Sequence, residues 1–362
     1  MTADAVGGVW SYILALAHAL APHDVRVTLA ALGPPPSAAQ RADALAVPGL
    51  SLVHRPYKLE WMDDSCEDVS RSGEWLAELD EAVRPDVVHL NGYALAARSW
   101  RAPVIVVAHS CVLSWWEAVR GESAPATWDR YAAAVARGVQ SADLVVAPTA
   151  AMLASIEAHY GRRSATAVIP NATSAARFAP HSKEPFVLAA GRVWDEAKNI
   201  GALDAVAATL PWPVYVAGDS RHPGGGRQAM RSAHALGALP ASALASWMAR
   251  AAIYALPARY EPFGLSALEA GLAGCALVLG DIPSLREVWG DAASFVAPDD
   301  GDALRHSLGA LMADHAARAN LGARALSRAL TYTPQRMAAS YLAQYERLAC
   351  EPAVAVRRAA SA

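Results

Sequence analysis

The chain has 362 residues and a formal net charge of −3, a length that favours two domains and a charge that predicts no nucleic-acid partner. Charged residues interrupt every long apolar run, so we expect no transmembrane segment. The first residues lack the basic start and apolar core that are typical of a signal peptide. The 4 cysteines are scattered without a CxxC pair, a zinc spacing or a disulfide framework, which favours a reducing cytoplasm.

A glycine pair lies near the start of the chain. Gly7-Gly8 precedes an amphipathic helix that we expect from about Ser11 to Ala21. Glycines before a helix leave backbone N–H groups open to a phosphate, although such a pair is also typical of a simple turn. A doubly wound domain places a central strand before such a loop. Only Met1 to Ala3 remain to form it, so we expect either that the true start lies upstream or that the chain has lost part of this strand. The alternative is that three residues suffice because the flanking strands close the gap.

The region after this helix alternates predicted elements with polar segments. Strands are predicted at 24–32 and 50–54, and a helix at 73–83. The polar residues 55–72 indicate a long loop between them. The pair Asp63-Asp64 in this loop is not the D-x-D arrangement of metal-dependent transferases. We therefore predict that the protein needs no metal.

Polar side chains follow two predicted strands of the first half. Asn91-Gly92 follows the strand at 85–90, and His109-Ser110 follows the strand at 103–108. Open parallel sheets bind ligands at the carboxyl ends of their strands. His109 is therefore a candidate site residue, and a solvated loop histidine is the alternative.

The first half ends in a helix, a strand and a linker. Thr149 has the chemistry of a helix N-cap. The last strand of this half is expected at 167–170, and the Pro-flanked polar residues 178–184 indicate a linker. The second half then opens on a fully apolar strand at 186–190, as in a buried parallel sheet.

Two cations follow this strand. Arg192 comes directly after Gly191, and Lys198 lies at the head of the next predicted helix. An Arg and a Lys that converge on a strand end and a helix N-terminus suit a pyrophosphate. Taken alone, both are more typical of surface charges.

The segment with the strongest functional signal is Tyr260–Glu269, which follows a buried strand at 251–257. Glu261 lies in the loop that leaves this strand, and Glu269 lies about two turns into the following helix. Gly264 lets a ligand approach the backbone closely. An isolated pair of Glu residues at this spacing is more typical of a loop carboxylate and a surface or capping Glu.

The rest of the second half continues the alternation. After a short strand at 276–279, Ser284 precedes Glu287 by three residues, which is the spacing of a capping box. Helices are expected at 302–319 and around 334–349.

The 260–269 segment resembles the E-x7-E signature of retaining glycosyltransferases of family 4, which have the GT-B fold. The resemblance implies that Glu269 binds the ribose diol of a sugar nucleotide and that Glu261 lies against the transferred sugar. It also implies that the backbone of Phe263, Gly264 and Leu265 binds sugar hydroxyls and phosphate.

The resemblance extends to the other candidates. It implies that Gly7-Gly8 faces the donor pyrophosphate, that Arg192 and Lys198 neutralise it, and that His109 lies near the donor sugar. The segment containing Leu239 corresponds to the one that lies along the nucleotide base. For the acceptor, the candidates are the tryptophans, whose ring faces can stack on sugars; they are Trp61, Trp115 and Trp116.

The expected fold is α/β of the GT-B type, with two doubly wound Rossmann-like domains that face each other across a cleft. We expect domains at 1–178 and 179–339, with a last helix at about 340–362 crossing back to the first. The resemblance implies a retaining hexosyltransferase that uses a nucleoside diphosphate sugar, a hydroxyl acceptor and no cofactor. Peripheral contact with a membrane stays open. The alternatives are a phosphorylase or epimerase on the same fold, or a sugar-nucleotide-binding protein without catalysis.

Overall fold

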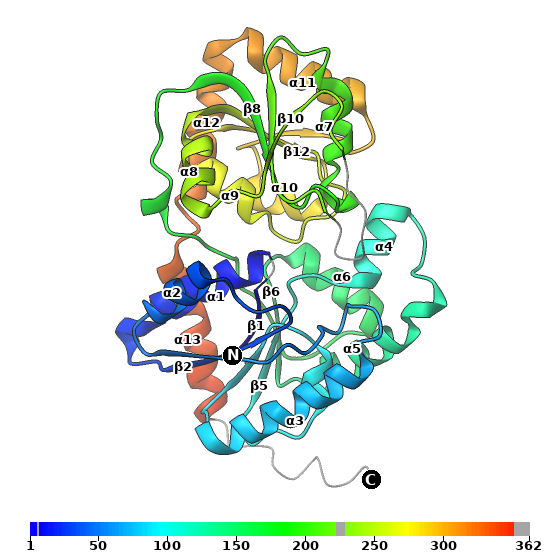
Figure 1. Cartoon of the computed structure of the whole chain (residues 1–362), viewed down its shortest axis with the longest axis vertical. Coiled ribbons are helices and arrows are strands. Elements are labelled where there is room, and N and C mark those ends of the chain that lie inside the picture. Colours follow the sequence, from blue (N-terminus) through cyan, green and yellow to red (C-terminus); the bar gives the residue numbers. More distant parts are fainter. Residues whose placement is uncertain (6, 222–228, 351–362) are drawn as a thin grey trace. The chain divides into compact units, whose positions relative to one another are not determined.

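The computed structural model describes residues 1–5, 7–221 and 229–350, which form two compact units (Figure 1). The first unit comprises Met1–Trp116, Ser123–Asn171 and the chain from Pro334 onward, and the second comprises Glu117–Glu122 and Ala172–Thr333. The sequence placed these boundaries at residues 178 and 340. Residues 351–362, part of the last segment assigned to the first domain, lie outside the described residues, as do residues 222–228.

The elements of the first unit follow in chain order. They are β1 (Thr2–Asp4), α1 (Gly8–Leu20), β2 (Val27–Leu32), α2 (Ala38–Leu45), β3 (Leu50–His54), α3 (Cys66–Val83), β4 (Val88–Leu90), the 3₁₀ helix η2 (Ala94–Ala97), β5 (Val104–Val107), α4 (Val112–Arg120), α5 (Asp129–Ser141), β6 (Leu144–Ala147), α6 (Ala150–Tyr160), β7 (Thr166–Val168) and α13 (Pro334–Cys350). Helix α4 continues into the second unit at Glu117. Helix α13 packs beside α1, although more than 300 residues separate them in sequence (Figure 1).

The second unit alternates strands and helices throughout. Its elements are β8 (Glu184–Ala190), the 3₁₀ helix η5 (Glu196–Lys198), α7 (Ile200–Ala207), β9 (Val214–Ala217), β10 (His234–Gly237), α8 (Ala241–Arg250), β11 (Ala251–Leu256), α9 (Leu265–Leu272), β12 (Ala276–Gly280), α10 (Pro283–Trp289), β13 (Ser294–Val296), α11 (Gly301–Ala313) and α12 (His315–Ala329). The strand β10 includes part of a segment that the sequence assigned only to contact with the base.

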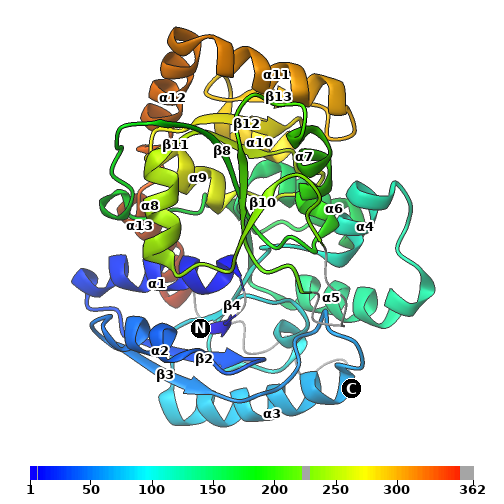
Figure 2. The same cartoon turned by 45° about the horizontal axis from the view of Figure 1, so that its top comes forward.

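The second unit is a six-stranded sheet in the order β10-β9-β8-β11-β12-β13, and all its neighbouring strands are parallel. Because side chains alternate along a strand, its apolar strands cover both faces. Leu188 and Tyr254 pack in the core formed with α8 and α9, whereas Val187 and Ile253 pack in the core formed with α7 and α11. Figures 1 and 2 show these two helix layers on opposite sides of the sheet.

The first unit holds two parallel sheets, β1-β2-β3 and β4-β5-β6-β7. The strand β1 pairs with β2 alone, and side chains join it to β4. The backbone N–H of Asn91, directly after β4, donates to Thr2 Oγ1 at 2.9 Å, and its side-chain amide donates to the Thr2 carbonyl at 2.7 Å. One asparagine thus links the carboxyl end of β4 to Thr2, the first residue of β1.

Two local expectations were wrong in their bounds, and a third was confirmed. Helix α3 begins at Cys66, not Gly73, so the predicted loop is shorter; Glu67 and Asp68 stabilise this start because they lie at the positive end of the helix dipole. The strand β2 begins only at Val27, after a left-handed residue at Asp24 (φ 56°). The N-cap at Thr149 is confirmed: its side chain accepts a hydrogen bond from Met152 N at 3.1 Å.

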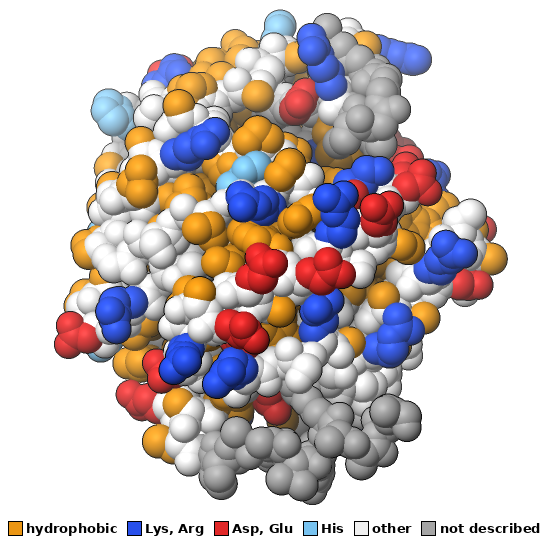
Figure 3. All heavy atoms as spheres, turned by 60° about the horizontal axis from the view of Figure 1, so that its bottom comes forward, with side chains coloured by type: hydrophobic (Ala, Val, Ile, Leu, Met, Phe, Trp, Pro, Cys, Tyr) orange, Lys and Arg blue, Asp and Glu red, His pale blue; other side chains and the backbone are white. Residues whose placement is uncertain are grey.

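The surface of the described residues carries mixed charges. On the face shown in Figure 3, acidic and basic side chains are interspersed among the coloured residues rather than gathered by sign. Among the helices that the structure describes, none is long and apolar enough to cross a membrane.

Candidate active site

The second unit gathers polar groups at the carboxyl edge of its sheet. The strands β8, β11 and β12 are neighbours and run parallel, so the loops that follow them meet at one edge. The loop after β8 supplies Arg192 and Lys198, the loop after β11 supplies Glu261, and the turn after β12 supplies Ser284. Short apolar strands therefore bring together residues more than 60 positions apart.

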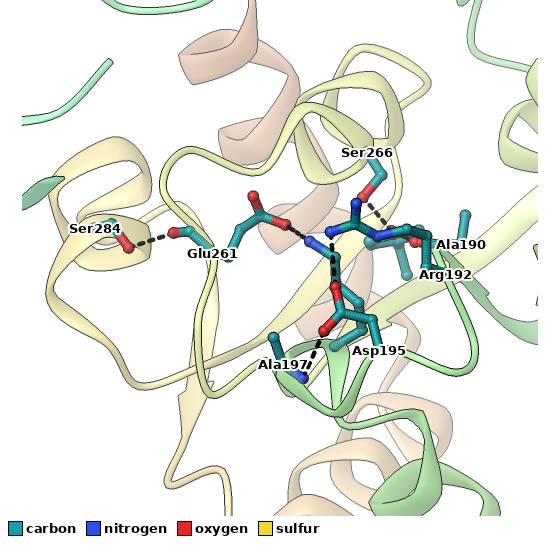
Figure 4. A network of polar contacts seen from close by, with 9 residues as sticks. Ala190, Arg192, Asp195, Ala197, Glu261, Ser266 and Ser284 are labelled. Carbon is teal, nitrogen blue, oxygen red and sulfur yellow. Dashed lines mark hydrogen bonds and ion pairs between the residues drawn. The ribbon is translucent and has the colours of Figure 1, made fainter. Parts of the chain in front are cut away.

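Lys198 and Glu261 form an ion pair at this edge. Lys198 Nζ lies 2.5 Å from Glu261 Oε2, and the two side chains are only 16% and 13% exposed (Figure 4). A pair shielded from water in this way is stronger than a surface pair, and each charge compensates the burial of the other. The charged end of Lys198 is therefore directed at the 260–269 segment.

Ser284 holds the backbone of Glu261. Its hydroxyl donates to the Glu261 carbonyl oxygen at 2.5 Å, across 23 positions of sequence (Figure 4). The predicted capping box is therefore wrong: α10 begins at Pro283, its N-cap is Ile282 without a side-chain cap, and Ser284 lies in the first turn. Pro is favoured at this first position because its missing N–H would have had no partner there.

Arg192 is oriented by a carboxylate. Its Nη2 donates to Asp195 Oδ2 at 2.7 Å, and Asp195 Oδ1 accepts from the backbone N–H of Ala197 at 3.1 Å. The guanidinium also lies 5.3 Å from the ring centre of Trp194. In Figure 4 the side chains of Arg192 and Glu261 point toward one another. Because the Arg192 side chain stays 42% exposed, its remaining donors are open to an anion.

The segment from Phe263 to Leu265 starts a helix with free backbone donors. Gly264 is the N-cap of α9 in the left-handed conformation (φ 90°), and no side chain caps this end. Phe263 is buried against Tyr332, with ring centres 5.5 Å apart, and this contact fixes the turn. The open N–H groups of such a helix start favour an anion or a hydroxyl oxygen. Leu239, after β10, packs half-buried against the adjoining core.

Glu269 lies in α9 beneath this turn. Burial raises the pKa of Glu269 to about 7, and the positive charge of Arg177 acts in the opposite direction. A buried carboxylate needs hydrogen-bond donors to be stable in its charged form. A ligand with paired hydroxyls would supply them.

The sequence missed Tyr254, a residue of β11 whose hydroxyl group joins the elements that carry this site. Its hydroxyl donates to the Ala190 carbonyl at 3.1 Å and lies 2.8 Å from Ser266 Oγ, so it joins the ends of β8 and β11 to α9. Burial raises the pKa of Tyr254, and the nearby charges of Glu261 and Glu269 raise it further. A tyrosine within an apolar strand carries no signal that separates this role from core packing.

In the first unit, Gly7 and Gly8 form the start of α1. Gly7 is its N-cap with φ 93°, and among the described residues no side chain caps this end. The helix carries Tyr12, whose ring meets the His109 ring edge-on with centres 4.6 Å apart. The glycine turn and His109 are thus linked through one buried side chain.

His109 follows β5 and is held by Asn91. Its Nε2 lies 2.7 Å from Asn91 Oδ1. Burial lowers the pKa of His109 to about 3, so its ring is neutral at pH 7. A neutral imidazole carries one N–H donor and one acceptor nitrogen, so His109 can recognise a hydroxyl without adding a charge.

Trp61 lies beside an anchored carboxylate that the sequence also missed. Glu60 accepts hydrogen bonds from the backbone N–H groups of Tyr93 and Ala94 at distances between 2.7 and 3.2 Å. This contact fixes the loop after β3 to the turn after β4. Trp61 itself is 37% exposed. Trp115 and Trp116, on α4, pack against each other edge-on with ring centres 5.8 Å apart.

The prediction that no metal is needed overlooked one D-x-D triplet, at Asp300-Gly301-Asp302. Both of its carboxylates have other partners. Asp300 caps α11 by accepting from Ala303 N at 2.8 Å, and Asp302 pairs with Arg305 at 3.2 Å. Over residues 1–5, 7–221 and 229–350, no group of three or more His, Cys, Asp or Glu could hold a metal ion.

Comparisons with known proteins show what the chain is similar to. The family model for Glycosyltransferase Family 4 matches residues 6–177, and that for Glycosyl transferases group 1 matches residues 184–314. The D-inositol 3-phosphate glycosyltransferase of Xylanimonas cellulosilytica is 28% identical over 90% of this chain and 88% of its own length. The glycogen synthase of Mycobacterium tuberculosis is 28% identical over 90% of this chain and 87% of its own.

Solved structures show the same fold. Sucrose-phosphate synthase from Thermosynechococcus elongatus superposes with a TM-score of 0.80 at 19% identity, over 95% of this chain and 94% of its own. HepE of Anabaena, solved with UDP-glucose, gives a TM-score of 0.73 at 15% identity, over 96% and 98% of the two chains. The chain therefore belongs to the glycosyltransferases of family 4 and has the GT-B fold.

Proposed function

We propose that this glycosyltransferase moves a hexose from a nucleoside diphosphate sugar to a hydroxyl acceptor, with retention of the anomeric configuration and without a metal. The observation that carries the proposal is the shielded Lys198–Glu261 ion pair, which lies next to the aligned Arg192 at the ligand-binding edge of the sheet. A preorganised cation at this edge suits a leaving group that gains negative charge.

The donor would be held by four groups of the second unit. Glu269 accepts hydrogen bonds from the ribose diol, and Glu261 accepts from hydroxyls of the sugar. Arg192 and Lys198 stabilise the diphosphate, together with the open N–H groups of the helix start at Gly264. Lys198 would then contact both the diphosphate and Glu261. Because Glu261 already holds the Lys198 ammonium group, that group is in position before the donor binds.

The reaction would use the substrate's own groups. The bond between the anomeric carbon and the phosphate oxygen breaks, and the acceptor oxygen forms its bond on the same face of the sugar. The acceptor proton passes to the departing phosphate oxygen. The protein supplies no nucleophile in this scheme; it supplies the cations that make the diphosphate a good leaving group. His109 remains neutral beside the sugar.

The donor and acceptor to test first are chosen from the comparisons and from the tryptophans. HepE was solved with UDP-glucose, so UDP-glucose is the first donor to test. The names of the two curated relatives point to different acceptors, an inositol phosphate and glycogen. Trp61, Trp115 and Trp116 are the candidate acceptor contacts, because an exposed indole face stacks on a sugar ring.

The test combines binding with turnover. Melting temperature is measured with UDP-, GDP- and ADP-glucose, each with and without EDTA, since a ligand that binds the native state raises it. Release of nucleoside diphosphate is then followed for the best donor. Glu269→Gln should weaken the nucleoside and the nucleotide sugar alike, whereas Glu261→Gln should lower turnover and leave nucleotide affinity near normal.

The matched control is Glu184→Gln, because Glu184 pairs with Arg250 at the start of β8 and lies 49% exposed. It should change neither binding nor turnover. Wild-type behaviour of both site variants would refute the site. Tight donor binding without release of the diphosphate on any acceptor or water would refute catalysis, and loss of turnover in EDTA would refute metal independence.

A further inference from the structure

The contacts of Asn91 with Thr2 determine which way its side-chain amide is turned. Its side-chain amide lies 2.7 Å from the carbonyl oxygen of Thr2, and its backbone N–H donates to Thr2 Oγ1 at 2.9 Å. A carbonyl oxygen can only accept a hydrogen bond, so the NH₂ group of Asn91 must face Thr2. The amide oxygen of Asn91 is thereby directed to His109 Nε2, 2.7 Å away.

This orientation determines the tautomer of His109. An amide oxygen has no proton to give, so Nε2 must carry the proton in this contact. In a neutral imidazole the other nitrogen, Nδ1, is then an acceptor with a free lone pair. Within the described residues, Nδ1 of His109 makes no hydrogen bond.

The neighbours of His109 support a neutral ring. The titratable groups that face it are Tyr12 of α1 and His89 of β4. Burial raises the pKa of Tyr12 and lowers that of His89 to about 3, so neither supplies a charge at pH 7 that would stabilise an imidazolium. Charging His109 in this apolar cluster would therefore cost free energy without a compensating partner.

We propose that Asn91, held by Thr2, is a positioning residue that fixes His109 as the neutral tautomer with its proton on Nε2, and so presents Nδ1 as a hydrogen-bond acceptor at the carboxyl edge of β5. The identity of the group that meets Nδ1, a hydroxyl of the donor sugar, rests on the proposed function. The tautomer itself does not.

The direct test is nitrogen NMR of the wild-type protein labelled with ¹⁵N-histidine, with His109 assigned through His109→Gln. Between pH 5 and 8 we expect Nε2 to give the signal of a protonated nitrogen and Nδ1 that of an unprotonated one. We expect the Nε2 proton to exchange slowly. A proton on Nδ1, or a doubly protonated ring at pH 7, would overturn the proposal without any variant.

Two variants of Asn91 then test its role. Asn91→Leu should make the Nε2 proton exchange rapidly and lower turnover of UDP-glucose by up to about 100-fold, with uridine affinity unchanged. Asn91→Asp should raise the pH at which His109 charges by at least about one unit, because a carboxylate stabilises an imidazolium. Unchanged His109 signals in both variants would also overturn the proposal.

The matched control is Tyr345→Phe. The Tyr345 hydroxyl lies 2.7 Å from Nδ1 of His89, in the same cluster, and does not contact His109. This variant should leave the His109 signals and turnover unchanged, whereas general loosening of the cluster would alter them in all variants alike. Should the protein turn over no donor, the NMR result still decides the tautomer, so the two proposals fail separately.

Discussion

The edge of the second unit that carries Glu261 and the edge of the first unit that carries His109 are built from different polar groups. The second unit uses charges: Lys198 with Glu261, and Arg192 with Asp195. The first unit uses neutral groups, in which Asn91 joins Thr2 to His109. Both edges lie at the carboxyl ends of parallel strands.

The difference follows from what each edge would have to stabilise. A charged diphosphate requires cations, and cations near apolar strands require carboxylates to compensate their burial. Recognition of neutral hydroxyls requires only donors and acceptors in fixed positions, and a charge there would add a desolvation cost. Altering the charges of one edge should therefore have larger effects than altering the hydrogen bonds of the other.

The largest effect is expected from Lys198→Met, which keeps the side-chain stem and removes its charge. We expect turnover to fall by about 100- to 1000-fold, the loss typical of one electrostatic contact to a developing charge. Glu261 would also lose its partner while only 13% exposed, so the free energy of unfolding should fall by about 1–3 kcal/mol. Diphosphate release and denaturant unfolding at pH 7 measure the two effects.

Arg250→Met is the control for this prediction. Arg250 also pairs with a glutamate, Glu184, at 3.2 Å, but the two side chains are 34% and 49% exposed. Arg250 ends the helix α8, and Glu184 starts β8, at the end of that strand away from Arg192. Removing an exposed pair should cost under about 1 kcal/mol and leave turnover unchanged. Equal losses in both variants would show that the Lys198 pair has no special role.

A smaller effect is expected from Gly218→Ala, which tests how closely the second unit's loops must pack. A Cβ at Gly218 would lie 1.7 Å from the carbonyl oxygen of Gly191, so the turn before Arg192 would have to move. Overpacking of this kind costs about 1–3 kcal/mol. Gly309→Ala is the control, because a Cβ there meets nothing within 4 Å and alanine favours the helix α11 by about 1 kcal/mol. Thermal unfolding should move in opposite directions in the two variants.

The sequence predicted the second unit's edge better than the first's. The strand β11 is a continuous apolar run with every residue buried, and the two glutamates follow it within a short segment, so local pattern and spacing were sufficient. The alternation of strands and helices likewise predicted the fold. These features depend on residues that are near one another in the chain.

The contacts that the sequence missed join residues over long separations. Ser284 binds Glu261 across 23 positions, Tyr254 binds Ala190 across 64, and Asn91 binds Thr2 across 89. Each has a local interpretation that the sequence favours: a helix cap, a core aromatic and a turn residue. Only the register of the strands shows which distant group each one meets.

The smallest expected effect concerns Glu269, a carboxylate of the second unit's edge whose protonation falls near neutral pH. Burial raises the pKa of Glu269 to about 7 because it disfavours the charged carboxylate. The charged form therefore becomes the major form only when the pH rises above 7. If the ribose diol donates to this carboxylate, uridine should bind more tightly at pH 8 than at pH 6.

The expected gain is about 10-fold, because a group with a pKa of 7 is about one-tenth ionised at pH 6 and about nine-tenths ionised at pH 8. Uridine is the proper probe, since it carries no phosphate that ionises in this range. Calorimetry should show the dependence in wild type and lose it in Glu269→Gln. Arg177→Ala should move its midpoint to higher pH, because Arg177 favours the charged carboxylate. A flat pH profile in wild type would mean that the ribose is bound elsewhere, and that the charges of this edge serve the diphosphate alone.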